Sequence, residues 1–156
     1  MLKWIKLLLI ALLSTAAFIL ENTFRVPDWF AELRSEVWTL SWSQQNILEA
    51  GLLGLAGVAF WLLWKDRRLG TLRWPAWSYA GILILSSLWS LFFFGSEAPL
   101  LGLLNMLALT ALLVLAAVQF YRYKRLSGYL LIPCILAALL FTVNNVLLYQ
   151  EYLGMN

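Results

Sequence analysis

The sequence predicts an all-α integral membrane protein, a bundle of five transmembrane helices in one domain covering residues 1–156. Three observations predict this fold class. First, 63% of the residues are hydrophobic and 12% are charged, whereas a soluble domain has about half apolar and about a quarter charged residues. Second, five apolar stretches are long enough for a helix to cross a hydrocarbon core of about 30 Å. Third, the basic residues between the stretches gather on one side if there are five crossings.

The first apolar stretch, residues 4–20, comes directly after a short basic start that contains Lys3 and Lys6. Small residues at positions 14–17 give the same stretch the features of a secretory signal peptide. We therefore expect a first membrane helix here, with a cleaved leader as the alternative.

Residues 21–45 form the only long polar connection in the chain. Pro27 and Asp28 favour the start of a short helix with Asp28 as its N-cap. Trp38 and Trp42 follow at a spacing of one helical turn. We expect this loop to be either a lid over a cavity or part of an aromatic belt at the membrane interface, where indoles commonly settle.

The second stretch, residues 46–64, carries Gly51, Gly54 and Gly57 at intervals of three residues. Small residues at this spacing let helix backbones approach closely, so we expect packing within one subunit, with a homodimer contact as the alternative. Glu49 lies near the start of the stretch. A carboxylate costs about 3 kcal/mol at the bilayer centre, so Glu49 either reaches the headgroups or belongs to a site.

The third stretch, residues 74–94, contains serines and aromatic rings in its second half, among them Ser86, Trp89 and Phe93. A helix that only anchors a protein needs leucines, whereas small polar groups beside rings can wall a binding site. Flat aromatic ligands suit such a wall because rings stack and a few polar groups fix their orientation. The alternative is that these rings are packing and interface anchors.

The fourth and fifth stretches are residues 100–120 and 128–149. Asn105 is the main polar residue in the fourth stretch, and Asn145 is one of several polar residues in the fifth stretch. Pro133 also lies in the fifth stretch, where a proline frees a carbonyl and can bend a helix.

The charges predict an orientation in the membrane rather than nucleic-acid binding. Nine of the eleven lysines and arginines fall on the side of the N-terminus, and only Arg25 and Arg34 fall on the other. By the positive-inside rule the N-terminus is cytoplasmic and the C-terminus is outside, and we expect a bacterial inner membrane. The nine are Lys3, Lys6, Lys65, Arg67, Arg68, Arg73, Arg122, Lys124 and Arg125.

Signatures of soluble enzymes are missing from the sequence. It has no histidine, no P-loop, no GxGxxG and no cluster with metal-ligand spacing. Its single cysteine, Cys134, excludes an intramolecular disulfide, and we interpret it as a small buried apolar residue. No stretch carries paired acids on one helix face. We therefore predict no catalytic residue, no metal site and no required cofactor.

Three segments carry a resemblance to a known family. Residues 86–93 read Ser-Ser-Leu-Trp-Ser-Leu-Phe-Phe, and residues 27–33 read Pro-Asp-Trp-Phe-Ala-Glu-Leu. In the fifth stretch, Leu-Leu-Ile-Pro-Cys at 130–134 is followed by Leu-Phe-Thr-Val-Asn-Asn at 140–145. With the length and the tryptophan content, these segments resemble the tryptophan-rich sensory protein / translocator protein family, relatives of the peripheral-type benzodiazepine receptor.

The resemblance implies five helices around a pocket that, in relatives, binds porphyrins, sterol-like lipids and synthetic drug ligands. The chain departs from the family pattern where an indole of the second helix becomes Glu49 and one of the fifth becomes Ala137. Cys134 replaces a tyrosine, and Ser86 replaces an asparagine. The residues expected to line the site are Trp38, Trp42, Glu49, Ser86, Trp89, Phe93, Ala137 and Asn145.

We therefore expect a membrane protein that binds a flat hydrophobic ligand, a tetrapyrrole such as a porphyrin or a sterol-like lipid, for sensing or transport. Its expected partners are the lipid bilayer and this ligand, with a second copy of the chain as an alternative and no nucleic acid. Two other functions stay open. One is an enzyme that degrades porphyrin in a light- or oxygen-dependent reaction, and the other is a structural or regulatory membrane partner without a ligand.

Overall fold

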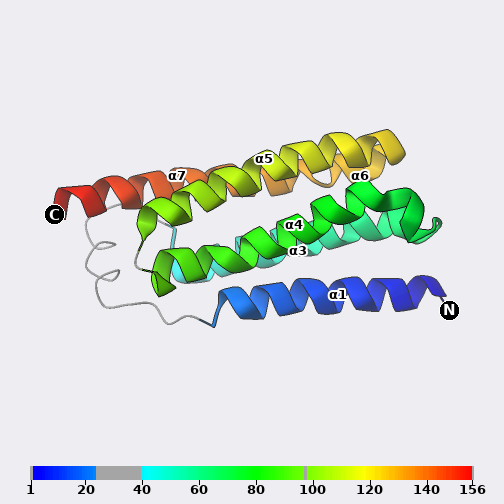
Figure 1. Ribbon diagram of the computed structural model, residues 1–156, viewed down its shortest axis with the longest axis horizontal. Coiled ribbons are helices and arrows are strands. Elements are labelled where there is room, and N and C mark those ends of the chain that lie inside the picture. The colour runs from blue at the N-terminus through cyan, green and yellow to red at the C-terminus, as the bar shows by residue number, and fades with distance from the viewer. Residues whose placement is uncertain (1, 24–39, 97, 156) are drawn as a thin grey trace.

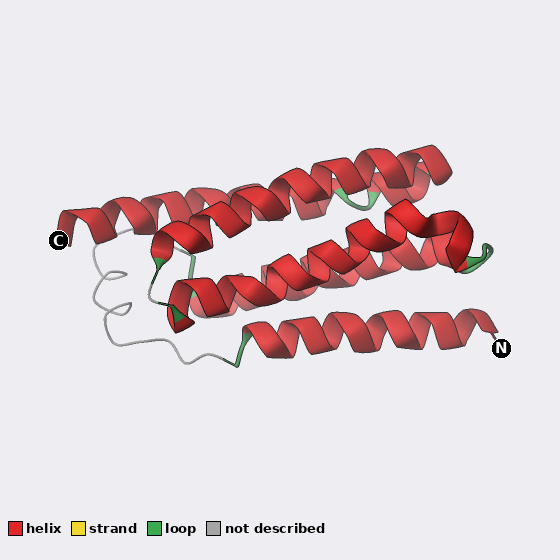
Figure 2. Ribbon diagram, in the orientation of Figure 1, coloured by secondary structure: helices red, strands yellow, loops and turns green. Residues whose placement is uncertain are grey.

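The computed structural model describes residues 2–23, 40–96 and 98–155, apart from the side chains of residues 42 and 155. All regular elements in these ranges are helices, and five of them are long and apolar enough to cross a membrane. Figure 1 shows them lying side by side, with the N-terminus and the C-terminus at opposite ends. Figure 2 shows how little of the described chain lies in loops. The predicted five-helix membrane bundle is confirmed.

The first two long helices are α1 (Leu2–Glu21) and α3 (Trp42–Trp64). Helix α3 begins four residues before the predicted stretch because Ser41 caps it. The Ser41 hydroxyl accepts from the Gln44 amide at 3.2 Å, and the Ser41 amide donates to Gln44 Oε1 at 2.8 Å. This reciprocal capping box satisfies two backbone donors at the start of the helix.

The third crossing is built from three pieces. One 3₁₀ turn, η1 (Leu69–Leu72), leads into α4 (Arg73–Ser90), and a π-helical turn, η2 (Leu91–Gly95), ends it. The amide of Ser96 donates to the carbonyl of Leu91 at 2.9 Å, which is the spacing of a π turn.

The last two crossings are α5 (Pro99–Tyr123) and the pair α6 (Arg125–Tyr129) and α7 (Ile132–Met155). The fifth crossing is therefore interrupted between α6 and α7. Pro133 is the second residue of α7, where the missing amide hydrogen leaves no intrahelical bond unmade. The proline thus lies at the start of a helix, and the break precedes it.

Helix α1 is attached to the side of the bundle, where it packs mainly against α3 and α4, whereas α5 packs against α4 and α7. Polar side chains link these neighbours within the apolar interior. The hydroxyls of Ser14 and Tyr79 lie 2.8 Å apart, and Asn105 Nδ2 donates to the Leu85 carbonyl at 2.8 Å. Such bonds between membrane helices are each worth about 0.6–2 kcal/mol.

Only one of the three repeated glycines of α3 allows a neighbouring helix to approach closely. A Cβ atom on Gly57 would lie 2.9 Å from Ile10 Cγ2, so this glycine allows α1 to approach α3. Gly51 and Gly54 have no such neighbour within 4 Å. Packing within the subunit therefore accounts for Gly57, and a homodimer contact stays a prediction.

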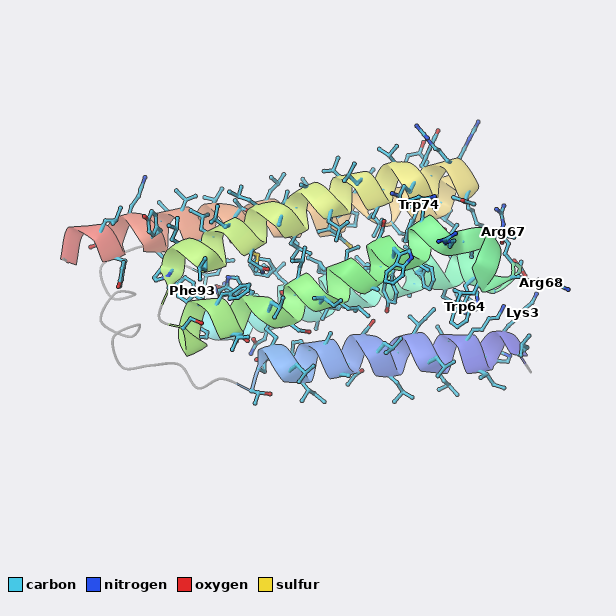
Figure 3. All side chains as sticks on the ribbon, in the orientation of Figure 1. Lys3, Trp64, Arg67, Arg68, Trp74 and Phe93 are labelled. Atoms are coloured by element: carbon cyan, nitrogen blue, oxygen red, sulfur yellow. The ribbon has the colours of Figure 1, made fainter. Side chains whose placement is uncertain are left out.

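The basic residues gather at the end of the bundle that holds the N-terminus. Figure 3 shows Lys3, Arg67 and Arg68 there and Phe93 towards the other end. Lys3 Nζ lies 2.9 Å from Asp66 Oδ1, and Lys6 Nζ donates to the Trp64 carbonyl at 2.7 Å. The Lys3 ammonium, by its hydrogen bond, holds the pKa of the Asp66 carboxyl below its ordinary value.

Candidate functional site

A small cavity lies among the helices at the opposite end of the bundle. It has room for about 10 Å³, which is roughly the space of one water molecule. Four of the five crossings bring a polar or aromatic side chain to it, and the fourth crossing adds a methionine. The lining residues are Glu21 of α1, Asn22 directly after it, Gln45, Asn46 and Glu49 of α3, Trp89 of α4, Met106 of α5, and Phe141 and Asn145 of α7.

Two carboxyl groups from different helices meet in this cavity. Glu21 is the last residue of α1 and Glu49 lies in the second turn of α3, and they are 7% and 4% exposed. The two side chains are within hydrogen-bonding reach of each other. Glu21 Oε2 and Glu49 Oε1 have no hydrogen-bond partner among the described residues. An ionised carboxylate oxygen only accepts, so either of these oxygens can receive a donor from a ligand when its acid is ionised.

A third oxygen without a partner lies beside the carboxyl pair. Ser86 of α4 is completely buried and faces Glu49. Its hydroxyl lies within reach of the Glu49 carboxyl, yet no hydrogen bond of normal geometry joins it to a described residue. Buried polar groups are nearly always satisfied, so three such oxygens in one place indicate a position prepared for another group.

The indole of Trp89 forms the aromatic wall of the cavity and is held in place on two sides. Its Nε1 donates to Asn145 Oδ1 at 3.0 Å, and Asn145 Nδ2 donates to the Phe141 carbonyl at 2.8 Å. Its ring stacks on Phe93 with centroids 5.3 Å apart and meets the edge of Phe94 at 5.5 Å. The indole is therefore fixed in orientation before any ligand binds.

The π turn η2 explains why two consecutive phenylalanines support the same indole. Neighbouring residues of an α-helix point about 100° apart, yet Phe93 and Phe94 are both buried. Their centroids lie 5.2 Å apart at an interplanar angle of 82°. The turn also brings Phe93 against Gly102 of α5, where a Cβ atom would lie 2.7 Å from the ring.

The structure places three of the eight predicted site residues on the cavity wall, namely Glu49, Trp89 and Asn145. Ser86 lies next to Glu49, and Phe93 supports Trp89 from behind. The last described side chain of the eight, Ala137, is buried in α7 but is not part of the lining.

Two predicted residues come from the loop. Trp38 lies outside the described residues, as does the side chain of Trp42, whose backbone opens α3. The predicted short helix at Asp28 also lies outside them, so the lid stays a prediction. At the described edge of the loop, the Leu40 amide donates to Asn144 Oδ1 at 3.2 Å, which joins the entry of α3 to α7.

Glu21 is the main residue that sequence reasoning missed, together with Gln45 of α3. The signal was present in α1, whose buried residues are Ile10, Ser14, Ala17 and Glu21. Their spacings of four, three and four residues mark one helix face, and Glu21 continues it. The expectation from the sequence concerned paired acids on one face of a single helix, whereas Glu21 and Glu49 form a pair between two helices.

Two larger grooves flank α1, one of about 540 Å³ towards α4 and one of about 330 Å³ towards α3. Their linings are almost entirely apolar, with Leu, Ile, Ala and Phe side chains. They suit acyl chains, but they lack the converging polar groups that orient a specific ligand. The small polar cavity is therefore the better candidate for specific recognition.

Five crossings with a small polar cavity between them at one end define the chain as an integral membrane protein. A sequence model of the TspO/MBR family matches residues 6–150. The chain therefore belongs to this family, as the resemblance implied, and is a membrane protein of the sensory and transport class.

Two curated relatives agree with this assignment. The chain is 29% identical over 126 residues to the tryptophan-rich protein TspO of Archaeoglobus fulgidus, a match that covers 81% of this chain and 72% of the relative. It is 28% identical over 115 residues to the tryptophan-rich protein TspO of Chlorobaculum tepidum, a match that covers 74% of this chain and 65% of the relative.

Proposed function

We propose that the chain senses or transports a flat hydrophobic ligand, a tetrapyrrole or a sterol-like lipid, that binds at the cavity between α1, α3, α4 and α7. The observation that carries this proposal is the fixed indole of Trp89 beside the amide of Asn145. A rigid ring offers a stacking face, and a few polar groups beside it fix the orientation of a bound molecule.

Binding a ligand of this size requires the cavity to open. Ligand pockets typically hold about 300–1,000 Å³, against about 10 Å³ here. Helix α1 is the element best suited to move, because it is the least buried crossing. Only 17% of its most apolar 18 residues are buried, against 33–44% for the other crossings. Its last residue, Glu21, belongs to the cavity wall. Outward movement of this end of α1 therefore enlarges the site.

A titration of the purified chain tests the proposal. Protoporphyrin IX and, separately, cholesterol are added to the detergent-solubilised chain, and tryptophan fluorescence is followed. We expect saturable binding of at least one of them. Trp89→Phe weakens it about two- to tenfold, because the phenyl ring offers a smaller stacking face and lacks the bond to Asn145 that orients the indole. A full ring contact is worth about 0.5–1.5 kcal/mol.

The matched control is Trp61→Phe, since Trp61 lies at the basic end and donates to the Lys3 carbonyl at 3.1 Å. This variant should keep the affinity of the unmodified chain. Equal weakening in both variants, or no saturable binding of either ligand, would contradict the proposed site. The second result would favour a structural or regulatory membrane partner.

We also propose that the basic end of the bundle faces the cytoplasm of a bacterium, with the chain in the inner membrane. The support is the gathering of Lys3, Arg67 and Arg68 at one end, together with the positive-inside rule. An alkaline phosphatase domain fused after Asn156 should then be active, because that enzyme needs an oxidising compartment. An inactive phosphatase and a fluorescent protein that reports a cytoplasmic C-terminus would reverse the orientation.

A further inference from the structure

We propose that Glu21, Glu49 and Ser86 form a subsite for a positively charged, ammonium-sized group. The group arrives either as the head of a hydrophobic amine or as a free cation. The proposal rests on the proposed function, in that the hydrophobic body of the ligand occupies the same opened cavity. It adds the chemistry of the polar head.

The first support is the electrostatic state of the cavity. Two carboxyl groups are buried side by side, and among the described residues neither is paired with a lysine or arginine. Arg25 and Arg34 lie outside those residues. Burying acidic groups without a partner is costly. A bound cation would offset that cost, whereas an anion would increase it.

The second support is the number and type of free acceptors. Glu21 Oε2, Glu49 Oε1 and Ser86 Oγ are buried without a hydrogen-bond partner in the described chain. A primary ammonium carries three N–H donors and no acceptor. Three acceptors from three different helices therefore match the donors of one ammonium, and the serine supplies an observation independent of the acids.

The third support is the size and wall of the space. In its closed form the cavity accommodates a single water-sized group beside the acids, which is about the size of an ammonium. The indole of Trp89 lines the same space, and indole is the ring that attracts cations best. The subsite therefore selects a compact cationic head attached to an apolar body.

This assignment predicts the class of ligand that the chain prefers. Hydrophobic primary amines should bind more tightly than neutral molecules of the same shape. Protoporphyrin IX carries two propionate groups, which the carboxyl pair repels if they point inward. Removing one acid should therefore weaken the binding of an amine more than the binding of protoporphyrin.

The test compares 2-naphthylmethylamine with 2-naphthylmethanol by isothermal titration calorimetry on the full chain in detergent. The two probes share shape and differ in charge. We expect the amine to bind about tenfold more tightly than the alcohol. Glu21→Gln and Glu49→Gln should each reduce amine affinity about tenfold and reduce alcohol affinity by a smaller factor.

The matched control is Glu151→Gln, the same change in α7 outside the cavity lining, which should bind both probes like the unmodified chain. Competition by ammonium chloride, compared with N-methylglucamine chloride at equal concentration, would support a subsite that is open to free cations. Lack of competition would support one that requires the hydrophobic body of the amine.

Equal affinity for the amine and the alcohol in the unmodified chain would overturn the cation subsite and leave the proposed function standing. That comparison needs no variant, so it decides the question even if an acid substitution prevents folding. A loss of alcohol affinity as large as the loss of amine affinity in both acid variants would also overturn it. Absence of binding by protoporphyrin IX, cholesterol and both naphthyl probes would overturn the proposed function itself.

Discussion

The hydrogen bond between Trp89 and Asn145 gives the sharpest prediction about stability. Trp89→Phe keeps an aromatic ring against Phe93 but removes the donor that satisfies Asn145 Oδ1 at 3.0 Å. Both side chains are buried, at 5% and 1% exposed. Leaving a buried acceptor without a partner costs about 1–3 kcal/mol of stability. The phenyl ring is also smaller than the indole, and the space it leaves unfilled adds to that loss.

A double-mutant cycle isolates the bond from the volume change. Trp89→Phe, Asn145→Ala and the double variant are unfolded in mixed micelles with increasing sodium dodecyl sulfate, and helix content is followed by circular dichroism. We expect a coupling energy of about 0.6–2 kcal/mol, the range measured for bonds between membrane helices.

Trp61→Phe is the control, because its indole bond to the Lys3 carbonyl is exposed and exposed bonds exchange readily with water. It should lose less stability than Trp89→Phe. Additive effects of the Trp89 and Asn145 substitutions, with a coupling energy within about 0.3 kcal/mol of zero, would refute the assignment of this bond as the support of the cavity wall.

Three further predictions concern the rest of the bundle. Gly128→Ala should destabilise the chain by about 1–3 kcal/mol in the same unfolding assay, because the added Cβ would lie 2.8 Å from the backbone Cα of Tyr121. Gly54→Ala should instead stabilise it by up to about 1 kcal/mol, since no neighbouring atom lies within 4 Å; a loss would indicate a packing contact there. The pKa of Asp66 is lowered by Lys3, so the contribution of their ion pair is present above the ordinary aspartate pKa and lost as the pH falls through the lowered one. A carbon-13 NMR titration in which Lys3→Gln leaves that pKa unmoved would contradict this.

The fold followed from the sequence because membrane crossing depends on length, apolarity and the position of charge. Five apolar stretches became five crossings, and the boundaries changed where local chemistry intervened. Ser41 capped α3 earlier than expected, and Pro133 began a helix instead of bending one. Neither change alters the number of crossings, which hydrophobic length determines.

The site was only partly predictable, because it depends on which faces of separate helices meet. Trp89, Glu49 and Asn145 were identified by residue type in a resembling pattern, and all three line the cavity. Glu21 was not, because at the end of a stretch an acid normally indicates a surface position. Only the packing of α1 against α3 turns it inward, next to Glu49.

The most direct test of the account is an experimental structure of the chain with a bound hydrophobic ligand. The account predicts ligand density at the end of the bundle opposite the basic residues, between α1, α3, α4 and α7, with the ring system against Trp89 and the polar head at Glu49. Density confined to the apolar groove between α1 and α4, with the polar cavity still closed, would contradict it.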